Sequence, residues 1–283
     1  MAKDTFFQIK TSLNIGGKIL DLSTPKVMGI LNITPDSFFE SSRVQTEKDI
    51  LSQAENMLSE GADILDLGAY SSRPGATDIS VAEEKERLLP AVKLVVKHFP
   101  NVIISVDTFR ASIAKEAVEN GAHIINDISG GNLDTEMFKT VGELGVPYIL
   151  MHMKGTPQTM KDLAHYDDLM GELNLYFSQK IALLKQAGVK DIVLDLGFGF
   201  AKNGVQNFTL LKHLADFRTL GFPILAGLSR KGMIYKTLGI SAEEALNGTT
   251  VLNTMAVLNG ASILRVHDVK EAKEVIKLIG MMN

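Results

Sequence analysis

The chain contains no cysteine, which excludes disulfide bonds and any metal site built on thiolates. Its six histidines include no His-x-His or His-Glu-x-x-His pattern, and this argues against a dedicated transition-metal site. The first residues lack the long apolar stretch of a signal peptide, and no later run is long enough to span a bilayer. A formal net charge of -4 leaves no basic stripe for nucleic acid. We therefore expect a soluble cytoplasmic protein that binds neither nucleic acid nor a membrane.

A glycine-led segment recurs along the chain where a helix-like pattern gives way to an apolar run. Each glycine stands where a helix end needs a residue in the left-handed conformation. The pattern is that of the helix-to-strand connection of a repeated βα unit. The copies are Gly61-Ala62-Asp63-Ile64-Leu65, Gly121-Ala122-His123-Ile124-Ile125 and Gly260-Ala261-Ser262-Ile263-Leu264, with looser copies at Gly145-Val146-Pro147, Gly188-Val189-Lys190 and Gly221-Phe222-Pro223.

Eight short apolar runs predict strands, and because they are continuous rather than alternating they indicate a parallel sheet covered on both sides. The predicted strands are Val27–Leu31, Ile64–Leu67, Val102–Val106, Ile124–Asn126, Tyr148–Met151, Ile192–Leu194, Ile224–Ala226 and Ile263–Val266. Amphipathic stretches that predict helices separate them, for example Glu47–Glu60, Val81–His98, Phe109–Asn120, Met137–Leu144 and Asp167–Ala187.

These repeated units predict an α/β protein consisting of a single (β/α)8 TIM barrel, for which 283 residues are sufficient. A doubly wound open sheet is the alternative, but no Gly-x-Gly-x-x-Gly segment follows the first strand. We expect one domain over residues 1–283. About residues 1–24 should form a β-hairpin covering one end of the core, because Phe6–Lys10 and Leu13–Leu22 flank the turn-forming Asn14-Ile15-Gly16-Gly17.

Polar residues follow most of the predicted strands at their carboxyl ends. In a barrel these ends meet at one mouth, where the active site is built. Alone, each residue has an ordinary structural interpretation: Asp107 could cap a helix, Asn126 could cap a turn, and His152 could be a core histidine. Together, five or more carboxylates and amides facing one cavity would be costly without a polar ligand, so we interpret the set as functional. Its members are Asn32, Asp66, Asp107, Asn126, Asp127, His152, Asp195, Arg265 and His267.

The residue types at this mouth suit a flat polar heterocycle and an anion. Carboxylates and an amide can accept hydrogen bonds from amino and ring N–H groups, while Lys231 offers a cation for a carbonyl. Arg265 and His267 add positive charge suited to phosphates. The amides at the start of the last helix, which follows His267, would favour the same anion. Arg73 could contribute in the same way or could be an ordinary charge on a surface loop.

Seven motifs, in one order and covering the chain from about Lys26 to its C-terminus, resemble the dihydropteroate synthase family of pterin-binding TIM barrels. They are Leu31-Asn32-Ile33-Thr34-Pro35-Asp36-Ser37-Phe38, Ser72-Arg73-Pro74-Gly75-Ala76, Ser105-Val106-Asp107-Thr108, Ile125-Asn126-Asp127, Asp195-Leu196-Gly197-Phe198-Gly199-Phe200, Ser229-Arg230-Lys231 and Arg265-Val266-His267-Asp268. The chain departs from the family at Tyr70, where Glu is common, at Glu40-Ser41-Ser42, where Asp-Gly-Gly is usual, and at Leu196, where Pro is common.

The resemblance implies a transferase of folate biosynthesis that condenses 6-hydroxymethyl-7,8-dihydropterin diphosphate with 4-aminobenzoate, and it implies a homodimer and Mg2+. The pterin would contact Asp107, Asn126, Met151, Asp195 and Lys231, and the diphosphate would contact Asn32, Arg265 and His267, with Asn32 as the metal ligand. The aminobenzoate site would be shaped by Ser72, Arg73, Pro74, Phe200 and Ser229. Catalysis would depend on Asn32, Asp107, Lys231, Arg265 and His267.

Two other functions stay open at this point. A pterin-binding methyltransferase domain that works with a corrinoid protein would share the barrel, but it would not need Arg73 or the Ser229-Arg230-Lys231 cluster. A non-catalytic paralogue would keep the barrel as a binding module, and the full set of polar residues at the mouth argues against it.

Overall fold

The computed structural model describes residues 9–33, 43–71 and 78–282. Its centre is a closed barrel of eight parallel strands in which each strand pairs with the next in sequence and β10 closes the ring on β3. The strands are β3 (Lys26–Asn32), β4 (Ile64–Gly68), β5 (Ile103–Asp107), β6 (Ile124–Asp127), β7 (Tyr148–Met151), β8 (Ile192–Asp195), β9 (Ile224–Ala226) and β10 (Ile263–Val266). The predicted (β/α)8 barrel is confirmed, and the open sheet is excluded.

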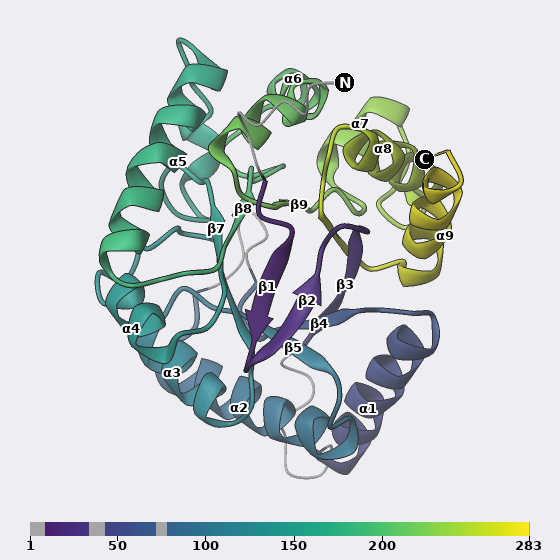
Figure 1. Ribbon diagram of the computed structural model, residues 1–283. Coiled ribbons are helices and arrows are strands. Elements are labelled where there is room, and N and C mark those ends of the chain that lie inside the picture. Colours follow the sequence, from purple (N-terminus) through teal and green to yellow (C-terminus); the bar gives the residue numbers. More distant parts are fainter. Residues whose placement is uncertain (1–8, 34–42, 72–77, 283) are drawn as a thin grey trace, which may run out of the picture.

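Helices surround the strands as an outer ring (Figure 1). They are α1 (Arg43–Ser59), α2 (Val81–His98), α3 (Ala111–Glu119), α4 (Met137–Leu144), α5 (Leu169–Gln186), α6 (Gly204–Lys212), α7 (Gly232–Leu238), α8 (Leu246–Leu258) and α9 (Val269–Gly280), with the 3-10 helices η2 (Met160–Leu163) and η3 (Leu214–Leu220). Helices α2 and α4 have the predicted bounds. Helix α3 starts after Arg110, and its first amide, on Ala111, donates to Asp134 Oδ2 at 2.8 Å, so Asp107 is not its cap.

The predicted glycine connections are confirmed by the backbone. All six glycines have positive φ, from 67° at Gly145 to 100° at Gly121. This left-handed conformation is open to glycine at little steric cost and reverses the chain from helix into strand. A short repeated signal therefore sets the spacing of the βα units.

The N-terminal hairpin consists of β1 (Ser12–Ile15) and β2 (Lys18–Asp21), joined at Gly16 and Gly17. Its first strand begins later than predicted, because Ile9 and Lys10 lie outside any strand. Residues 6–8 of the predicted strand lie outside the described residues. The hairpin still covers one end of the barrel (Figure 1). Its buried Leu13 packs in a cluster with the inward residues at the amino ends of the barrel strands, namely Met28, Ile64, Ile124, Ile149, Val193, Leu225 and Ile263.

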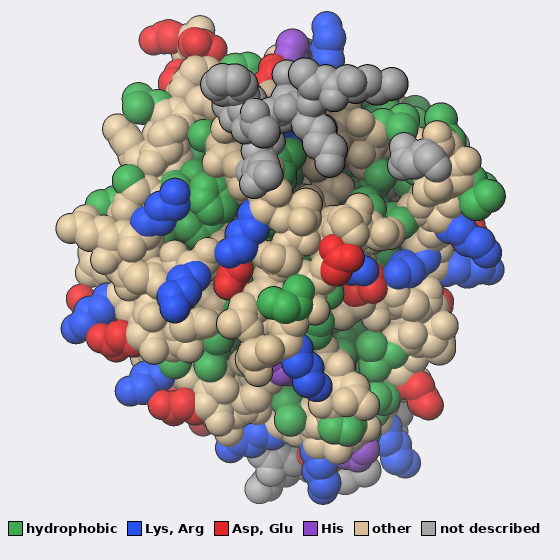
Figure 2. Space-filling view, viewed as in Figure 1, with side chains coloured by type: hydrophobic (Ala, Val, Ile, Leu, Met, Phe, Trp, Pro, Cys, Tyr) green, Lys and Arg blue, Asp and Glu red, His purple; other side chains and the backbone are tan. Residues whose placement is uncertain are grey.

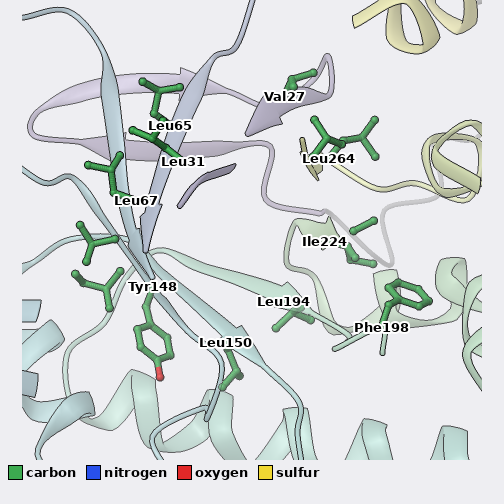
Figure 3. Packing of buried hydrophobic residues seen from close by; sticks show 14 of the residues in the cluster. Val27, Leu31, Leu65, Leu67, Tyr148, Leu150, Leu194, Phe198, Ile224 and Leu264 are labelled. Atoms are coloured by element: carbon green, nitrogen blue, oxygen red, sulfur yellow. The ribbon is translucent and has the colours of Figure 1, made fainter. Parts of the chain in front are cut away.

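Successive strand residues alternate between the barrel interior and the surrounding helices. Outward residues such as Leu31, Leu65 and Leu194 belong to a large apolar core, and Tyr148 and Leu150 extend toward neighbouring helices (Figure 3). The inward positions at the amino ends of the strands are apolar, and the hairpin covers them. Polar inward residues are therefore concentrated at the opposite end, where the strands finish.

On the face drawn in Figure 2, basic and acidic side chains are interspersed rather than gathered into a patch of one sign. Within the described ranges, no helix combines the length and apolar character needed to cross a membrane.

The hairpin contact gives a test of the fold. Replacing Leu13, which is 1% exposed, by Ala should lower the free energy of unfolding by roughly 2–5 kcal/mol, because it leaves a cavity under the barrel. Urea denaturation measures the change. The control is Ile19→Ala on the same hairpin, where the side chain is 70% exposed and the expected change is within about 0.5 kcal/mol. Equal effects would mean that the hairpin does not stabilise the barrel.

Candidate active site at the carboxyl ends of the barrel strands

The register of the barrel brings distant polar residues side by side at the mouth. Asp107 is paired with Asn126 across β5 and β6, and Met151 with Asp195 across β7 and β8. Gly68 of β4 lies opposite Asp107, and a methyl group there would approach Asp107 Cβ to 3.3 Å. The absence of a side chain at Gly68 thus leaves room for the Asp107 carboxylate.

Arg265 of β10 is the centre of an ion-pair network across the mouth. Its Nε atom donates to Asp66 Oδ2 at 2.6 Å, and its Nη2 atom donates to Asp107 Oδ2 at 2.8 Å. Asn126 Nδ2 donates to the same Asp66 oxygen at 3.1 Å. Asp66 therefore joins two of the predicted site residues, Arg265 and Asn126, and Arg265 in turn binds Asp107. Asp66 was predicted at the mouth but without a role in the site.

One cation faces two carboxylates in this network, and their charges are coupled. Burial raises the pKa of Asp107, and the charge of Arg265 opposes this rise. The neighbouring Asp66 carboxylate raises the pKa of Asp107 further, to about 7. Burial disfavours the charge of Arg265, but Asp66 and Asp107 outweigh this and raise its pKa. The guanidinium therefore stays charged, while Asp107 can hold a proton near neutral pH.

Asp195 and Lys231 form the second polar pair of the site. Burial lowers the pKa of Lys231 to about 8, although the charge of Asp195 acts in the opposite direction. Burial also raises the pKa of Asp195, and Lys231 opposes that rise. Asp195 Oδ1 accepts from the backbone of Gly197 at 2.8 Å, while Lys231 Nζ donates to the Phe198 carbonyl. The remaining carboxylate oxygen of Asp195 is available for a planar ligand.

Ser229 and His267 are brought together from β9 and β10. The Ser229 Oγ and His267 Nδ1 atoms share a hydrogen bond of 3.0 Å, and the His267 backbone N–H donates to the same Oγ at 3.2 Å. Arg230, between Ser229 and Lys231, instead donates from Nη2 and Nε to both oxygens of Asp268, at 2.8 and 3.0 Å. Its role is to hold the loop after β9 against the start of α9.

Lys202 is a buried lysine that was not among the predicted site residues. Its Nζ atom donates to the His152 Nδ1 atom and to the carbonyls of Gly197 and Phe200, each at 3.1 Å. Burial lowers the pKa of Lys202 to about 7, and burial together with the charge of Lys202 lowers the pKa of His152 to about 2. His152 is therefore a neutral acceptor that ties β7 to the loop after β8. The only signal in the sequence is a lysine seven residues beyond Asp195, and its burial could not be inferred from that.

An apolar wall completes the described part of the mouth. Met151 packs in a buried cluster with Ile128, Met153, Met160 and Ala201, and Phe109 and Phe200 pack against it as partly buried rings. The Lys231 Nζ atom lies 4.8 Å from the centre of the Phe200 ring. A flat ring bound over Asp107, Asn126 and Asp195 would have this wall at its side.

Asn32 ends β3 at the same mouth, with an exposed side chain. The described residues contain no group of three or more acidic or histidine side chains that could hold a metal ion by themselves. An amide oxygen is a suitable ligand for Mg2+, which commonly takes only one or two protein ligands and completes its shell with phosphate and water. Ser72, Arg73 and Pro74 lie outside the described residues. Nearby Tyr70 packs edge-on against Phe109 with ring centres 5.0 Å apart.

Comparison with known proteins assigns this arrangement to a class. Residues 28–267 match the family model described as "Pterin binding enzyme", which spans the barrel and every candidate site residue named above. The chain is thus a member of the class of pterin-binding enzymes.

The relatives narrow the class further. The chain is 43% identical over 265 residues to the dihydropteroate synthase of Escherichia coli, with 93% of each chain covered, and 38% identical to that of Haemophilus influenzae, covering 94% of this chain and 97% of the relative. A crystal structure of the Yersinia pestis dihydropteroate synthase with a sulfonamide drug superposes with a TM-score of 0.90 at 39% identity, covering 96% and 98% of the two chains. The chain therefore belongs to the dihydropteroate synthase family of transferases.

Proposed function

We propose that the barrel mouth condenses 6-hydroxymethyl-7,8-dihydropterin diphosphate with 4-aminobenzoate, giving 7,8-dihydropteroate and diphosphate for folate biosynthesis. The observation that carries the proposal is the convergence of Asp107, Asn126, Asp195, Lys231 and Arg265 on one mouth. Support also comes from a solved relative, the Xanthomonas albilineans dihydropteroate synthase with 4-aminobenzoic acid, at 36% identity and a TM-score of 0.88.

The pterin ring is proposed to lie over Asp195, Asn126 and Asp107. Asp195 accepts from the ring N–H and the exocyclic amino group together, a two-bond contact that suits a carboxylate. Lys231 donates to the pterin carbonyl, for which it needs the proton that it holds below about pH 8. Met151 and Phe200 flank the ring, and Ser229, with the loop that carries Ser72, Arg73 and Pro74, shapes the aminobenzoate site.

The diphosphate is proposed to lie near Arg265, His267 and Asn32. Arg265 supplies a lasting positive charge because its two carboxylate neighbours keep it protonated. The start of α9, directly after Asp268, adds backbone N–H groups that favour an anion. Asn32 would hold Mg2+, which when bound neutralises part of the diphosphate charge.

The chemistry requires an anion to leave and an amine to arrive. As the bond between the pterin methylene carbon and the bridging oxygen breaks, its electron pair leaves with diphosphate, and the electron-rich ring delocalises the positive charge. The amine lone pair of aminobenzoate then forms the new C–N bond, and the nitrogen passes one proton to the departing diphosphate or to solvent. The amine is already neutral at physiological pH, so the protein mainly orients the two reactants and stabilises the leaving anion.

Replacement of Asp195 by Asn should keep the fold and largely abolish pterin binding. The amide places a donor against the donors of the ring, a mismatch that costs about 1–3 kcal/mol or more in a buried site. Titration calorimetry with a pterin analogue measures the loss. Asp216→Asn is the control, because its carboxyl group is 61% exposed outside the site. Near-wild-type affinity of Asp195→Asn would show that the pterin binds elsewhere.

Arg265→Ala should slow turnover far more than it weakens the binding of a pterin that lacks phosphates. The guanidinium is proposed to meet only the diphosphate, whose charge grows as the bond breaks, so its loss acts on the transition state. Steady-state kinetics and calorimetry on the same variant compare the two effects. The exposed Arg218, near the opposite end of the barrel, gives the control variant Arg218→Ala. Equal losses in both measurements would make Arg265 a structural residue.

A homodimer is proposed to form through the outer face of α8. Val251, Met255 and Leu258 are 51%, 41% and 59% exposed and recur at the spacing of one helix face. Helices α7 and α9 lie beside α8 (Figure 1), and they add the exposed Leu238 and Leu278. Such a patch is typical of a surface that another chain covers.

Light scattering tests the dimer. The mass should fall from twice the chain mass of 30.8 kDa to that of one chain when Val251 and Met255 are both replaced by Glu. Leu175→Glu on α5 is the control, because this side chain is 59% exposed on a helix across the barrel from α8 (Figure 1). A wild-type mass equal to one chain would refute the homodimer.

The cytoplasm is the proposed compartment. A pterin diphosphate carries several negative charges and cannot cross an apolar bilayer unaided, because moving unpaired charge out of water is costly. The enzyme must therefore work where this substrate is made.

A further inference from the structure

The buried Asp66 carboxylate joins the two halves of the site, although Asp66 is not among the proposed substrate contacts. Asp66 has no exposed surface, and its Oδ2 atom accepts from both Arg265 Nε and Asn126 Nδ2. Under the proposed roles, Arg265 meets the diphosphate and Asn126 meets the pterin. The other oxygen, Oδ1, has no hydrogen-bond partner in the part of the chain that the structure describes. A single oxygen thus connects the two residues that hold opposite ends of one substrate.

The contact with Asp66 decides which way the Asn126 amide faces. An ionised carboxylate can only accept hydrogen bonds, so the amide must turn its NH2 group toward Asp66. The Asn126 carbonyl oxygen then points away from Asp66. Because the amide is only 3% exposed, water cannot easily stabilise the reversed orientation. Asp66 therefore selects whether the pterin meets an acceptor or a donor at this position.

The same carboxylate decides which edge of the Arg265 guanidinium is free. Of its five N–H groups, the Nε–H is bonded to Asp66, and one N–H of Nη2 is bonded to Asp107. No described residue accepts from Nη1. Nη1 and the second N–H of Nη2 are left as donors, which suit phosphate oxygens.

We propose that Asp66 is a positioning residue, which aligns Arg265 and Asn126 on the same bound pterin diphosphate without touching it. The inference rests on the proposed function, since it needs a substrate with a donor-rich ring at one end and an anion at the other. The competing explanation is that Asp66 only neutralises a buried arginine and so maintains the fold.

Asp127 provides a matched control on the neighbouring strand. It is also fully buried, and it accepts from Ser129 N at 2.7 Å, Gly131 N at 2.8 Å and Tyr148 Oη at 2.6 Å. Asp127 was predicted among the functional residues at the mouth, and this is wrong, because its carboxylate faces the loop after β6 and the outer core. Its partners include no residue of the proposed site. Asp127→Asn therefore measures the general cost of removing a buried charge next to the mouth.

The test is a double-mutant cycle of Asp66→Asn and Arg265→Ala, measured by kcat/KM on the dihydropterin diphosphate and 4-aminobenzoate. Asp66→Asn should lower kcat/KM by roughly 100-fold in the native background but by only about 10-fold, the part that acts through Asn126, when Arg265 is already absent. The affinity of Asp66→Asn for a pterin without phosphates should also fall by roughly 10-fold, because the Asn126 amide is no longer held in one orientation. Folded Asp127→Asn should stay within about 3-fold of wild type in both measurements.

Each outcome separates the explanations. Additive losses in the cycle, or equal losses for Asp66→Asn and Asp127→Asn, would reduce Asp66 to a structural residue. A wild-type chain that does not turn over the two substrates would instead refute the proposed function.

A measurement on the wild-type protein covers the case in which Asp66→Asn does not fold. The Arg265 Nε proton, assigned by NMR from its loss in Arg265→Ala, should exchange slowly with solvent because a fully buried carboxylate holds it. Rapid exchange of this proton would overturn the proposal.

Discussion

Closure of the barrel is the constraint on which the site depends. Once the eight strands close, every second side chain must enter an interior that has only two ends. The end at which the strands begin is occupied by Met28, Ile64 and their apolar neighbours, and the hairpin covers it. Inward charged side chains on the same strands can therefore be accommodated only at the mouth, where the strands end and where these side chains can meet one another or a ligand. The location of the site follows from this division of the interior.

Charge balance then decides how the mouth is organised. Two carboxylates would repel each other in a dry interior, and the single guanidinium of Arg265 between Asp66 and Asp107 holds them together. The balance is incomplete, since one cation faces two potential anions, and the raised pKa of Asp107 is the result. Elsewhere at the mouth, the charge of Asp195 opposes the effect of burial on the pKa of Lys231, and the charge of Lys231 does the same for Asp195. The mouth is thus arranged as two polar groups on opposite sides, beside an apolar wall.

At the two departures from the family pattern that lie among the described residues, the side chain packs against its neighbours. Leu196, where proline is common, is fully buried in the core outside the barrel. Tyr70, where glutamate is common, packs on Phe109 and accepts a hydrogen bond from Gln158 Nε2 at 3.2 Å. The Arg110 guanidinium carbon lies 5.7 Å from the centre of the Tyr70 ring, so a cation still faces this position. Neither change reaches the network around Arg265.

The sequence by itself determined the architecture, because its signals are local. A glycine at six of the helix-to-strand connections and a continuous apolar run after each define βα units of some thirty residues, and eight strands close into a barrel. The list of polar residues at the strand ends followed from the same reasoning. The hairpin was harder, since Asn14 and Ile15 look like turn residues but are paired with β2. Their pairing depends on the contact with the barrel floor.

Only the tertiary structure decided which of these polar residues act together. Asp66 and Arg265 are 199 positions apart in the chain, and they meet because β10 closes the ring beside β3. The burial of Lys202 and its bonds to His152 arise in the same way from loops on neighbouring strands. A hydrogen bond depends on distances of a few tenths of an ångström, and these are set by the register and closure of the whole sheet. No local pattern in the sequence contains that information.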